Sequence, residues 1–167
     1  MEELIDDAEI ARLISVEKPL PDNWERRLRP RSRIELSHKR ADLVIETPEG
    51  VFTIIVRENM INVRNFSVIL AFTRRNGTLF RLRRYNGWHG GHTNHIEIQD
   101  IKGCHIHKAT ARYQIAGHRE DAYAVASDGF TDVNSALRLM FSECGFKMSD
   151  SKIGNQDDPQ LKLIPEK

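Results

Sequence analysis

The spacing of hydrophobic positions changes along the chain and divides it into three parts. Over residues 2–16, apolar side chains recur every three or four positions, which is typical of one face of an amphipathic helix. Pro19 and Pro21 follow and predict that this helix ends before them. Residues 24–39 are rich in arginine and have no clean period, so they predict a partly irregular connector with a short strand near 34–36.

The second part has the two-residue spacing of strands. Four β-branched or aromatic runs, separated by short turn-forming links, cover residues 41–47, 51–58, 66–73 and 78–85. Such short links predict an antiparallel meander. In the last run Phe80 and Leu82 alternate with Arg81 and Arg83. Because neighbours on a strand point to opposite faces, we expect the apolar pair to face the core and both guanidinium groups to face outward together.

The third part combines short strands with a second helical pattern. Two short strands and a turn of helix are expected at residues 104–107, 123–127 and 109–114. Residues 131–146 carry apolar side chains at helical spacing, with Thr131 or Asp132 as the N-cap. Together these elements predict one α+β domain over residues 1–146, a mostly antiparallel meander with an N-terminal and a C-terminal helix on one face. Residues 147–167 are polar and predict a flexible tail.

Composition limits the classes of protein that fit. The 167 residues are 40% hydrophobic and 29% charged, as in a single soluble globular domain. No apolar stretch is long enough to cross a bilayer, and the acidic start lacks the order of a signal peptide, so we expect a cytoplasmic protein without a membrane partner. Cys104 and Cys144 alone imply no disulfide framework. The net charge is +1, but arginines crowd residues 25–33 and 74–84 and predict a locally basic surface.

Six of the seven histidines lie between residues 89 and 118. His105 and His107 are two positions apart in a predicted strand, so their imidazoles should lie side by side on one face, with Ile106 toward the core. The loop before them contains glycines at 87, 90 and 91, which allow its imidazoles to converge on a ligand. We therefore expect His92 or His95 to lie beside the strand pair.

One interpretation of this cluster is metal-independent cleavage of RNA, with no cofactor. One histidine would take the proton of a ribose 2′-hydroxyl, and another would protonate the leaving oxygen. Lys108 and Arg112 would stabilise the charge on phosphorus, while Glu97, two residues after His95, would orient a loop imidazole. The expected catalytic residues are His105, His107, His92, His95, Glu97, Lys108 and Arg112. The expected RNA-binding residues are Arg81, Arg83, Tyr85, Trp88 and Tyr113.

Two other interpretations remain open. In the first, neutral histidines bind zinc or another divalent ion for a hydrolase, with His89, His92, His105 and His107 as alternative ligands. The spacing permits this site, although no motif such as H-E-x-x-H is present. In the second, the histidines and the aromatic residues belong to the surface of a module that binds protein or nucleic acid without any chemistry.

The blocks "RYNGWHGGHTNHIE" and "HIHKATARYQ", followed by "SECGF", resemble an uncharacterised bacterial and phage-borne family with H-T-N-x-I-E and H-I-H-x-A-T-x-R-Y-Q blocks. The resemblance spans residues 43–146 and implies relatedness without an activity. More distantly, the order of a histidine cluster, an H-x-H pair and a helix resembles TumE-type toxins, and the helices-plus-meander plan is similar to RelE-like ribonucleases. That likeness implies a ribonuclease toxin with a cognate antitoxin, or alternatively a phage factor that binds a host protein.

Overall fold

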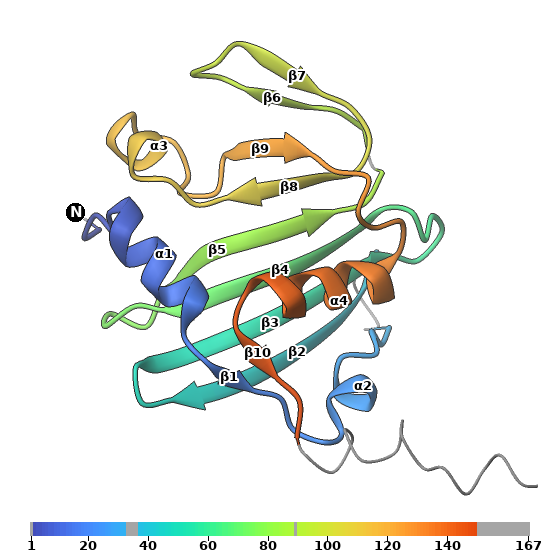
Figure 1. Ribbon diagram of the computed structural model, residues 1–167. Coiled ribbons are helices and arrows are strands. Elements are labelled where there is room, and N and C mark those ends of the chain that lie inside the picture. Colours follow the sequence, from blue (N-terminus) through green and yellow to red (C-terminus); the bar gives the residue numbers. More distant parts are fainter. Residues whose placement is uncertain (1, 33–36, 89, 150–167) are drawn as a thin grey trace, which may run out of the picture.

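The computed structural model describes residues 2–32, 37–88 and 90–149. A six-stranded sheet in the order β2-β3-β4-β5-β8-β9 forms its centre, and every neighbouring pair of strands is antiparallel (Figure 1). Its strands are β2 (His38–Thr47), β3 (Gly50–Asn59), β4 (Phe66–Thr73), β5 (Leu79–Asn86), β8 (His105–Lys108) and β9 (Tyr123–Ala126). The predicted α+β meander is confirmed.

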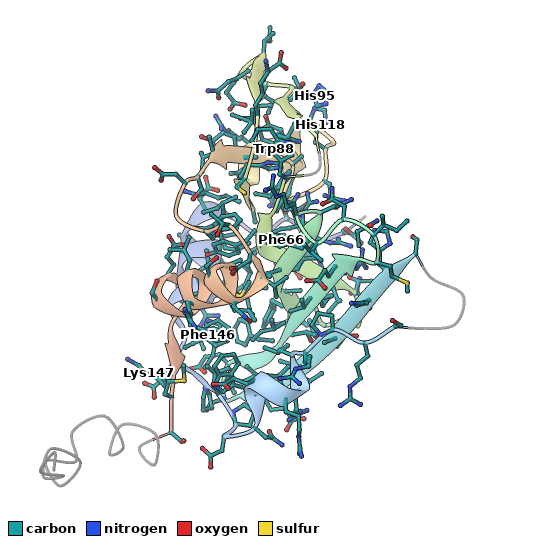
Figure 2. The ribbon with its side chains drawn as sticks, turned by 90° about the vertical axis from the view of Figure 1, so that its right-hand side faces the viewer. Phe66, Trp88, His95, His118, Phe146 and Lys147 are labelled. Carbon is teal, nitrogen blue, oxygen red and sulfur yellow. The ribbon has the colours of Figure 1, made fainter. Side chains whose placement is uncertain are left out.

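Two helices lie on the same face of this sheet. They are α1 (Asp7–Ser15) and α4 (Val133–Glu143), and Figure 2 shows α4 on one side of the sheet in a view turned by 90°. Asp6 caps α1 by accepting a hydrogen bond from the Glu9 amide at 2.8 Å, and Asp132 with Ser135 forms a capping box at the start of α4. None of the helices in the described ranges is long and apolar enough to cross a membrane. We call the sheet face under α1 and α4 the helix face and the opposite one the open face.

Shorter elements complete the domain. Helix α2 (Trp24–Arg27) lies in the predicted connector, and the short strand expected at 34–36 falls outside the described residues. Strand β1 (Lys18–Pro19) pairs with β10 (Phe146–Lys147), so the chain leaving α1 is joined to the chain leaving α4. Strand β10 thus includes the first residue of the expected tail, whose remainder from 150 onward is not described. Helix α3 (Ala111–Ile115) lies in the connection from β8 to β9, and the hairpin of β6 (His92–Asn94) and β7 (Gln99–Ile101) lies beside β9.

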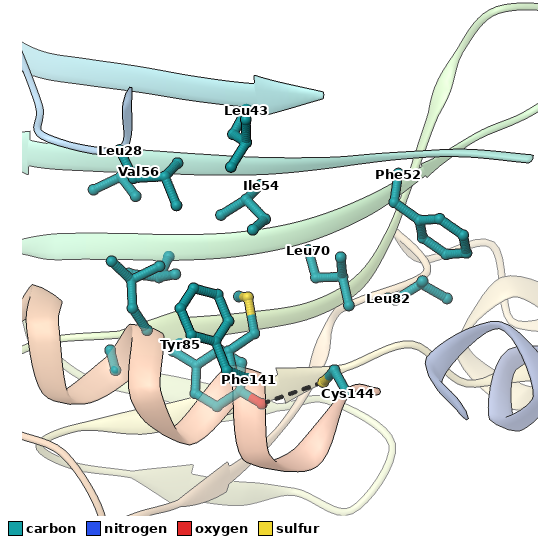
Figure 3. Close-up of a cluster of buried hydrophobic side chains, with 14 of the residues drawn as sticks. Leu28, Leu43, Phe52, Ile54, Val56, Leu70, Leu82, Tyr85, Phe141 and Cys144 are labelled. Atoms are coloured by element: carbon teal, nitrogen blue, oxygen red, sulfur yellow. Dashed lines mark hydrogen bonds between the residues drawn. The ribbon is translucent and has the colours of Figure 1, made fainter. Parts of the chain in front are cut away.

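The core fills the space between the helix face and the two helices (Figure 3). Phe80 and Leu82 are fully buried there, as their alternation predicts. Tyr85 is also fully buried, and its hydroxyl donates to Glu143 at 2.6 Å. Burial is the largest cause that raises the pKa of Tyr85. The expectation that Tyr85 binds RNA is therefore wrong, because its ring belongs to the core.

A β-bulge in β5 makes the expectation that Arg81 and Arg83 face outward together wrong. Ala71 pairs with Arg81 and Leu70 with Arg83, so Leu82 has no partner on β4. The extra residue shifts the alternation by one position. Arg83 consequently lies on the helix face beside Leu70, while Arg81 lies on the open face, so the two guanidinium groups do not share a face. Arg84 takes the open-face position that the uninterrupted pattern assigns to Arg83.

Candidate functional site

A pocket of about 400 Å³ opens where the open face meets the β6–β7 hairpin. It is lined by Arg84, Asn86, Gly91, His92, His95, His105, His107, His118, Arg119 and Ala122. Three parts of the chain contribute: strands β5 and β8, the start of the hairpin, and the loop between α3 and β9. We call this the histidine pocket, because five of its ten lining residues are histidines.

Three imidazoles cluster at the base of the histidine pocket. The ring centroids of His105 and His107 are 4.9 Å apart, which confirms that the two side chains share one strand face. The ring of His92 lies 4.5 Å from that of His107 and 5.8 Å from that of His105. Ile106 points to the core, as expected. The predicted approach of a loop histidine to the strand pair is therefore confirmed for His92.

Each of these three rings is held by a backbone carbonyl. His105 Nδ1 lies 2.8 Å from the Gly103 oxygen, His107 Nδ1 lies 2.9 Å from the Asp121 oxygen, and His92 Nε2 lies 2.8 Å from the Ala122 oxygen. A carbonyl oxygen can only accept, so these ring nitrogens carry the protons and donate. The hydrogen bonds fix the orientation of all three rings before any ligand arrives.

Asn94 explains why the hairpin places His92 here. Its amide group donates to the Ala124 oxygen at 2.7 Å and accepts from the Ala124 amide at 2.8 Å, so the side chain pairs with β9 as a strand would. Asn94 is fully buried, and Ile101 on β7 is 5% exposed. This pairing fixes the hairpin to the edge of the sheet and holds His92, two residues earlier, over β8.

His107 is kept neutral by its surroundings. Only 3% of it is exposed, and burial is the largest cause that lowers its pKa to about 2. The neighbouring Arg84 guanidinium and the rings of His105 and His92 act in the same direction. At neutral pH this imidazole is therefore an uncharged hydrogen-bonding group or metal ligand.

Two guanidinium groups line the histidine pocket around a buried carboxylate. Arg84 lies opposite His107 in the strand register, and its Nε donates to Asp121 Oδ2 at 2.9 Å. Arg119 donates to the other oxygen of Asp121. The Asp121 side chain is fully buried, whereas half of the Arg119 side chain is exposed. Asp121 therefore positions both cations on the wall of the pocket.

Two histidines form the rim of the histidine pocket. The rings of His95 and His118 are nearly parallel, with an interplanar angle of 10° and centroids 5.7 Å apart. Both side chains are exposed, and Figure 2 shows them together at the end of the molecule that carries the hairpin. Both imidazoles are therefore in contact with solvent.

The remaining predicted catalytic residues lie elsewhere. Lys108 follows His107 on β8 and therefore points to the opposite face of the sheet. Glu97 does not orient an imidazole: it accepts from the Tyr113 hydroxyl at 2.6 Å and pairs with Arg112. The run after His95 is a turn rather than an extended strand, so the expected alignment of Glu97 with that histidine is wrong. His89 lies outside the described residues.

The aromatic residues expected to bind RNA differ in their exposure. Tyr113 is fully buried beside Glu97 and Tyr123, so the expectation that it contacts RNA is wrong. Trp88 is 60% exposed, and its ring packs closely enough on Gly103 that a Cβ there would lie 3.1 Å away. Trp88 remains available at the surface near the histidine pocket.

Sequence reasoning missed four polar residues of the histidine pocket: Arg84, Asn86, His118 and Arg119. The alternation alone does not place Arg84 and Asn86 on the open face, because the bulge at Leu82 has no signature in the sequence pattern. His118 and Arg119 belong to an aperiodic loop whose position depends on long-range contacts. The clustering of six histidines was the signal that could have included His118.

Within residues 2–32, 37–88 and 90–149, no three side chains of His, Cys, Asp or Glu stand at the mutual spacing of metal ligands. The cluster of His92, His105 and His107 comes nearest in composition, since imidazoles are common ligands of zinc. Binding of a metal would require these rings to adjust.

A family model matches residues 5–145 of the chain. The chain belongs to DUF6978, a family of unknown function. No curated protein and no solved structure matched the chain. Membership of DUF6978 agrees with the resemblance to an uncharacterised family and gives no support to a relation with TumE-type or RelE-like toxins. The function of the histidine pocket must therefore be argued from its own residues.

Proposed function

We propose that the histidine pocket cleaves phosphodiester bonds of RNA without a metal ion. The observation that supports this proposal is that five imidazoles and two guanidinium groups face one space of about 400 Å³. Proton transfer and stabilisation of a phosphate's negative charge are the two requirements of this reaction. A member of DUF6978 with this pocket has both kinds of group within one concave site.

The reaction needs a base, an acid and a cationic cradle. The base takes the proton from a ribose 2′-hydroxyl, whose oxygen attacks phosphorus and forms a 2′,3′-cyclic phosphate. The 5′-oxygen of the next nucleotide leaves and receives a proton from the acid, so one proton is taken up and one is delivered. Arg84 and Arg119 hold the non-bridging oxygens, the charge-stabilising role that the sequence predicts for Lys108 and Arg112.

His95 and His118 are the best candidates for proton transfer. Their exposed rings face each other across the rim, so one can accept a proton while the other donates one. His107, whose pKa is lowered to about 2, stays neutral and contributes a hydrogen bond rather than a proton. His92 and His105 hold the base of the pocket in shape.

The test is cleavage of short RNA oligonucleotides by untagged protein in the presence of a chelator. We expect His118→Ala and His95→Ala each to lower the rate by about 10²–10⁴, the usual contribution of a general acid or base. His38→Ala is the matched control, because His38 is exposed on β2 and does not line the pocket. The wild-type rate should show a bell-shaped pH profile. Failure to cleave any RNA refutes the proposal, and binding without cleavage favours a nucleic-acid-binding module.

A second candidate is a hydrolase that binds a divalent metal such as zinc. The observation in its favour is that His92, His105 and His107 each donate one ring N–H to a backbone carbonyl, as metal-bound histidines usually do. Elemental analysis of untagged protein decides between the candidates. Stoichiometric metal that is lost in His92→Ala, together with cleavage that a chelator abolishes, would replace the metal-free proposal.

A further inference from the structure

A row of polar side chains crosses the open face and ends at the histidine pocket. Directly paired residues on neighbouring strands lie on the same face of a sheet, so the register places five of them in line. They are Arg40 on β2, Arg57 on β3, Ser67 on β4, Asn86 on β5 and His105 on β8. The Ser67 hydroxyl donates to Asn86 Oδ1 at 2.7 Å, and Asn86 Nδ2 lies 3.5 Å from His105 Nε2. We call this set the polar row; it contains no acidic residue.

Among the described residues, Arg57 differs from Arg40, Arg81 and Arg84 of the open face in making no ion pair. Arg40 pairs with Asp42 at 2.9 Å, Arg81 pairs with Glu120 at 3.5 Å, and Arg84 pairs with Asp121 at 2.9 Å. The Arg57 side chain is exposed and makes no hydrogen bond or ion pair with any residue of the described ranges. A guanidinium in this setting has its full hydrogen-bonding capacity available for an external anion.

The surroundings of Arg57 are themselves cationic. Partial burial and then the neighbouring charges of Arg40 and Arg81 lower its pKa, and only Asp42 opposes them. An arginine remains protonated despite such shifts, so three guanidinium groups lie near one another. Like charges held together are stabilised by a ligand that carries negative charge.

The distance between Arg57 and the histidine pocket fits a strand of several nucleotides better than a mononucleotide. From β3 to β8 the polar row crosses three strand spacings, or about 14 Å at ~4.8 Å each. One strand of a duplex advances ~3.4 Å per nucleotide along the helix axis, and an unpaired strand is longer per nucleotide, so the row has room for at most about four nucleotides. We propose that the open face binds a single strand of RNA along the polar row, with phosphates on Arg57 and Ser67 and the scissile phosphate in the histidine pocket.

This inference rests on the proposed function, since it extends the substrate from a phosphodiester to an oligonucleotide. The polar row has no Phe, Tyr or Trp side chain, and the ring of His105 is fully buried, so recognition should depend on phosphates and tolerate any sequence. Ser67 and Asn86 lie between the arginines of the row and His105, both are uncharged, and Asn86 is already part of the pocket lining.

The test measures binding of 2′-O-methyl oligoribonucleotides, which lack the attacking hydroxyl, by fluorescence anisotropy. For the wild-type protein we expect affinity to rise from two to about five nucleotides and then to level off. Arg57→Gln should weaken binding of an eight-nucleotide strand about two- to fivefold and leave dinucleotide binding unchanged. Its plot of log K against log salt should be shallower by about 0.7, the value for one lost phosphate contact on a single strand.

Arg138→Gln is the matched control, because Arg138 is exposed on α4, which covers the helix face. Thermal unfolding of both variants checks that each is folded. Wild-type affinity and salt dependence of Arg57→Gln for the long strand would overturn the inference. Equal competition by a polyglutamate peptide of the same charge would overturn it as well, since the surface would then select acidic chains in general.

The two proposals can fail separately. If dinucleotides are cleaved but Arg57→Gln keeps the length-dependent gain in affinity, the strand-binding inference is wrong and the pocket chemistry stands. If Arg57→Gln loses that gain but no RNA of any length is cleaved, the polar row binds RNA and the catalytic proposal is wrong.

Discussion

Replacing Asp121 by asparagine tests how the histidine pocket is held together. The carboxylate is fully buried and joins Arg84 and Arg119 through its two oxygens. Asparagine has the same shape but no charge, so the substitution leaves the partly buried Arg84 guanidinium without its counter-ion. Only 17% of the Arg84 side chain is exposed, so solvent can replace little of the lost interaction.

The expected loss of stability is about 3 kcal/mol, the lower end of the range for removing one partner of a buried ion pair, because the asparagine oxygen still accepts one hydrogen bond. Asp42→Asn provides the control. The Arg40–Asp42 pair has the same 2.9 Å separation, but its side chains are 26% and 36% exposed. An exposed pair contributes about 0–1 kcal/mol, so burial alone should separate the two variants.

Urea unfolding followed by circular dichroism measures both free energies. We expect Asp121→Asn to lower the midpoint strongly without changing the slope, and Asp42→Asn to leave the midpoint almost unchanged. Arg84→Met added to Asp121→Asn should recover part of the loss, since the unpaired charge is then absent. Equal effects of the two single variants, or no recovery in the double variant, would refute the argument that the cost comes from an uncompensated buried charge.

Two further substitutions test the junction of α1 and α4. Lys18→Met should destabilise the protein by about 2–4 kcal/mol in urea unfolding, because the buried Lys18 Nζ donates to the backbone oxygens of Leu13, Ile14, Val16 and Cys144 at 2.8–3.0 Å. Burial lowers the pKa of Lys18 to about 8 in the folded protein, whereas an unfolded lysine has a pKa of about 10.4. Between these two pH values unfolding takes up a proton. The free energy of unfolding of the wild type, relative to that of Lys18→Met, should therefore rise from pH 8 to 10. Gly145→Ala should cost about 2 kcal/mol or more by thermal unfolding, because φ is +75° and the new Cβ would lie 2.5 Å from the Val16 oxygen. Gly77→Ala, with φ +83° and open space around it, should cost about 1 kcal/mol; equal losses would contradict the steric argument.

Regular spacing made most of the fold predictable. The four strands of the meander and the long terminal helices repeat apolar residues at a period that belongs to one kind of element. The same two-residue period placed His105 and His107 on one face, and the neighbouring glycines indicated that a loop histidine could reach them. These inferences need only local geometry, which the order of residues determines.

The contacts that decide the chemistry of the pocket are long-range and were not predictable in this way. Arg119 and Asp121 lie in an aperiodic loop, and their partner Arg84 is more than thirty residues earlier in the chain. Asn94 pairs with β9 from a distance of thirty residues, in the manner of a backbone strand. An extended run would align Glu97 with His95, but the chain turns there and the Glu97 carboxylate pairs with Arg112.

The bulge at Leu82 connects the core to the histidine pocket. Before it, Phe80 and Leu82 fill the core, and after it Tyr85 does the same with the alternation shifted by one position. Without the extra residue, Arg84 would lie on the helix face, away from His107 and Asp121. With it, Arg84 stands opposite His107, lowers the pKa of that imidazole, and reaches Asp121. A single unpaired residue in β5 thus places the Arg84 guanidinium on the open face next to the histidines. Bulges are common next to active sites because they re-aim a side chain in this way.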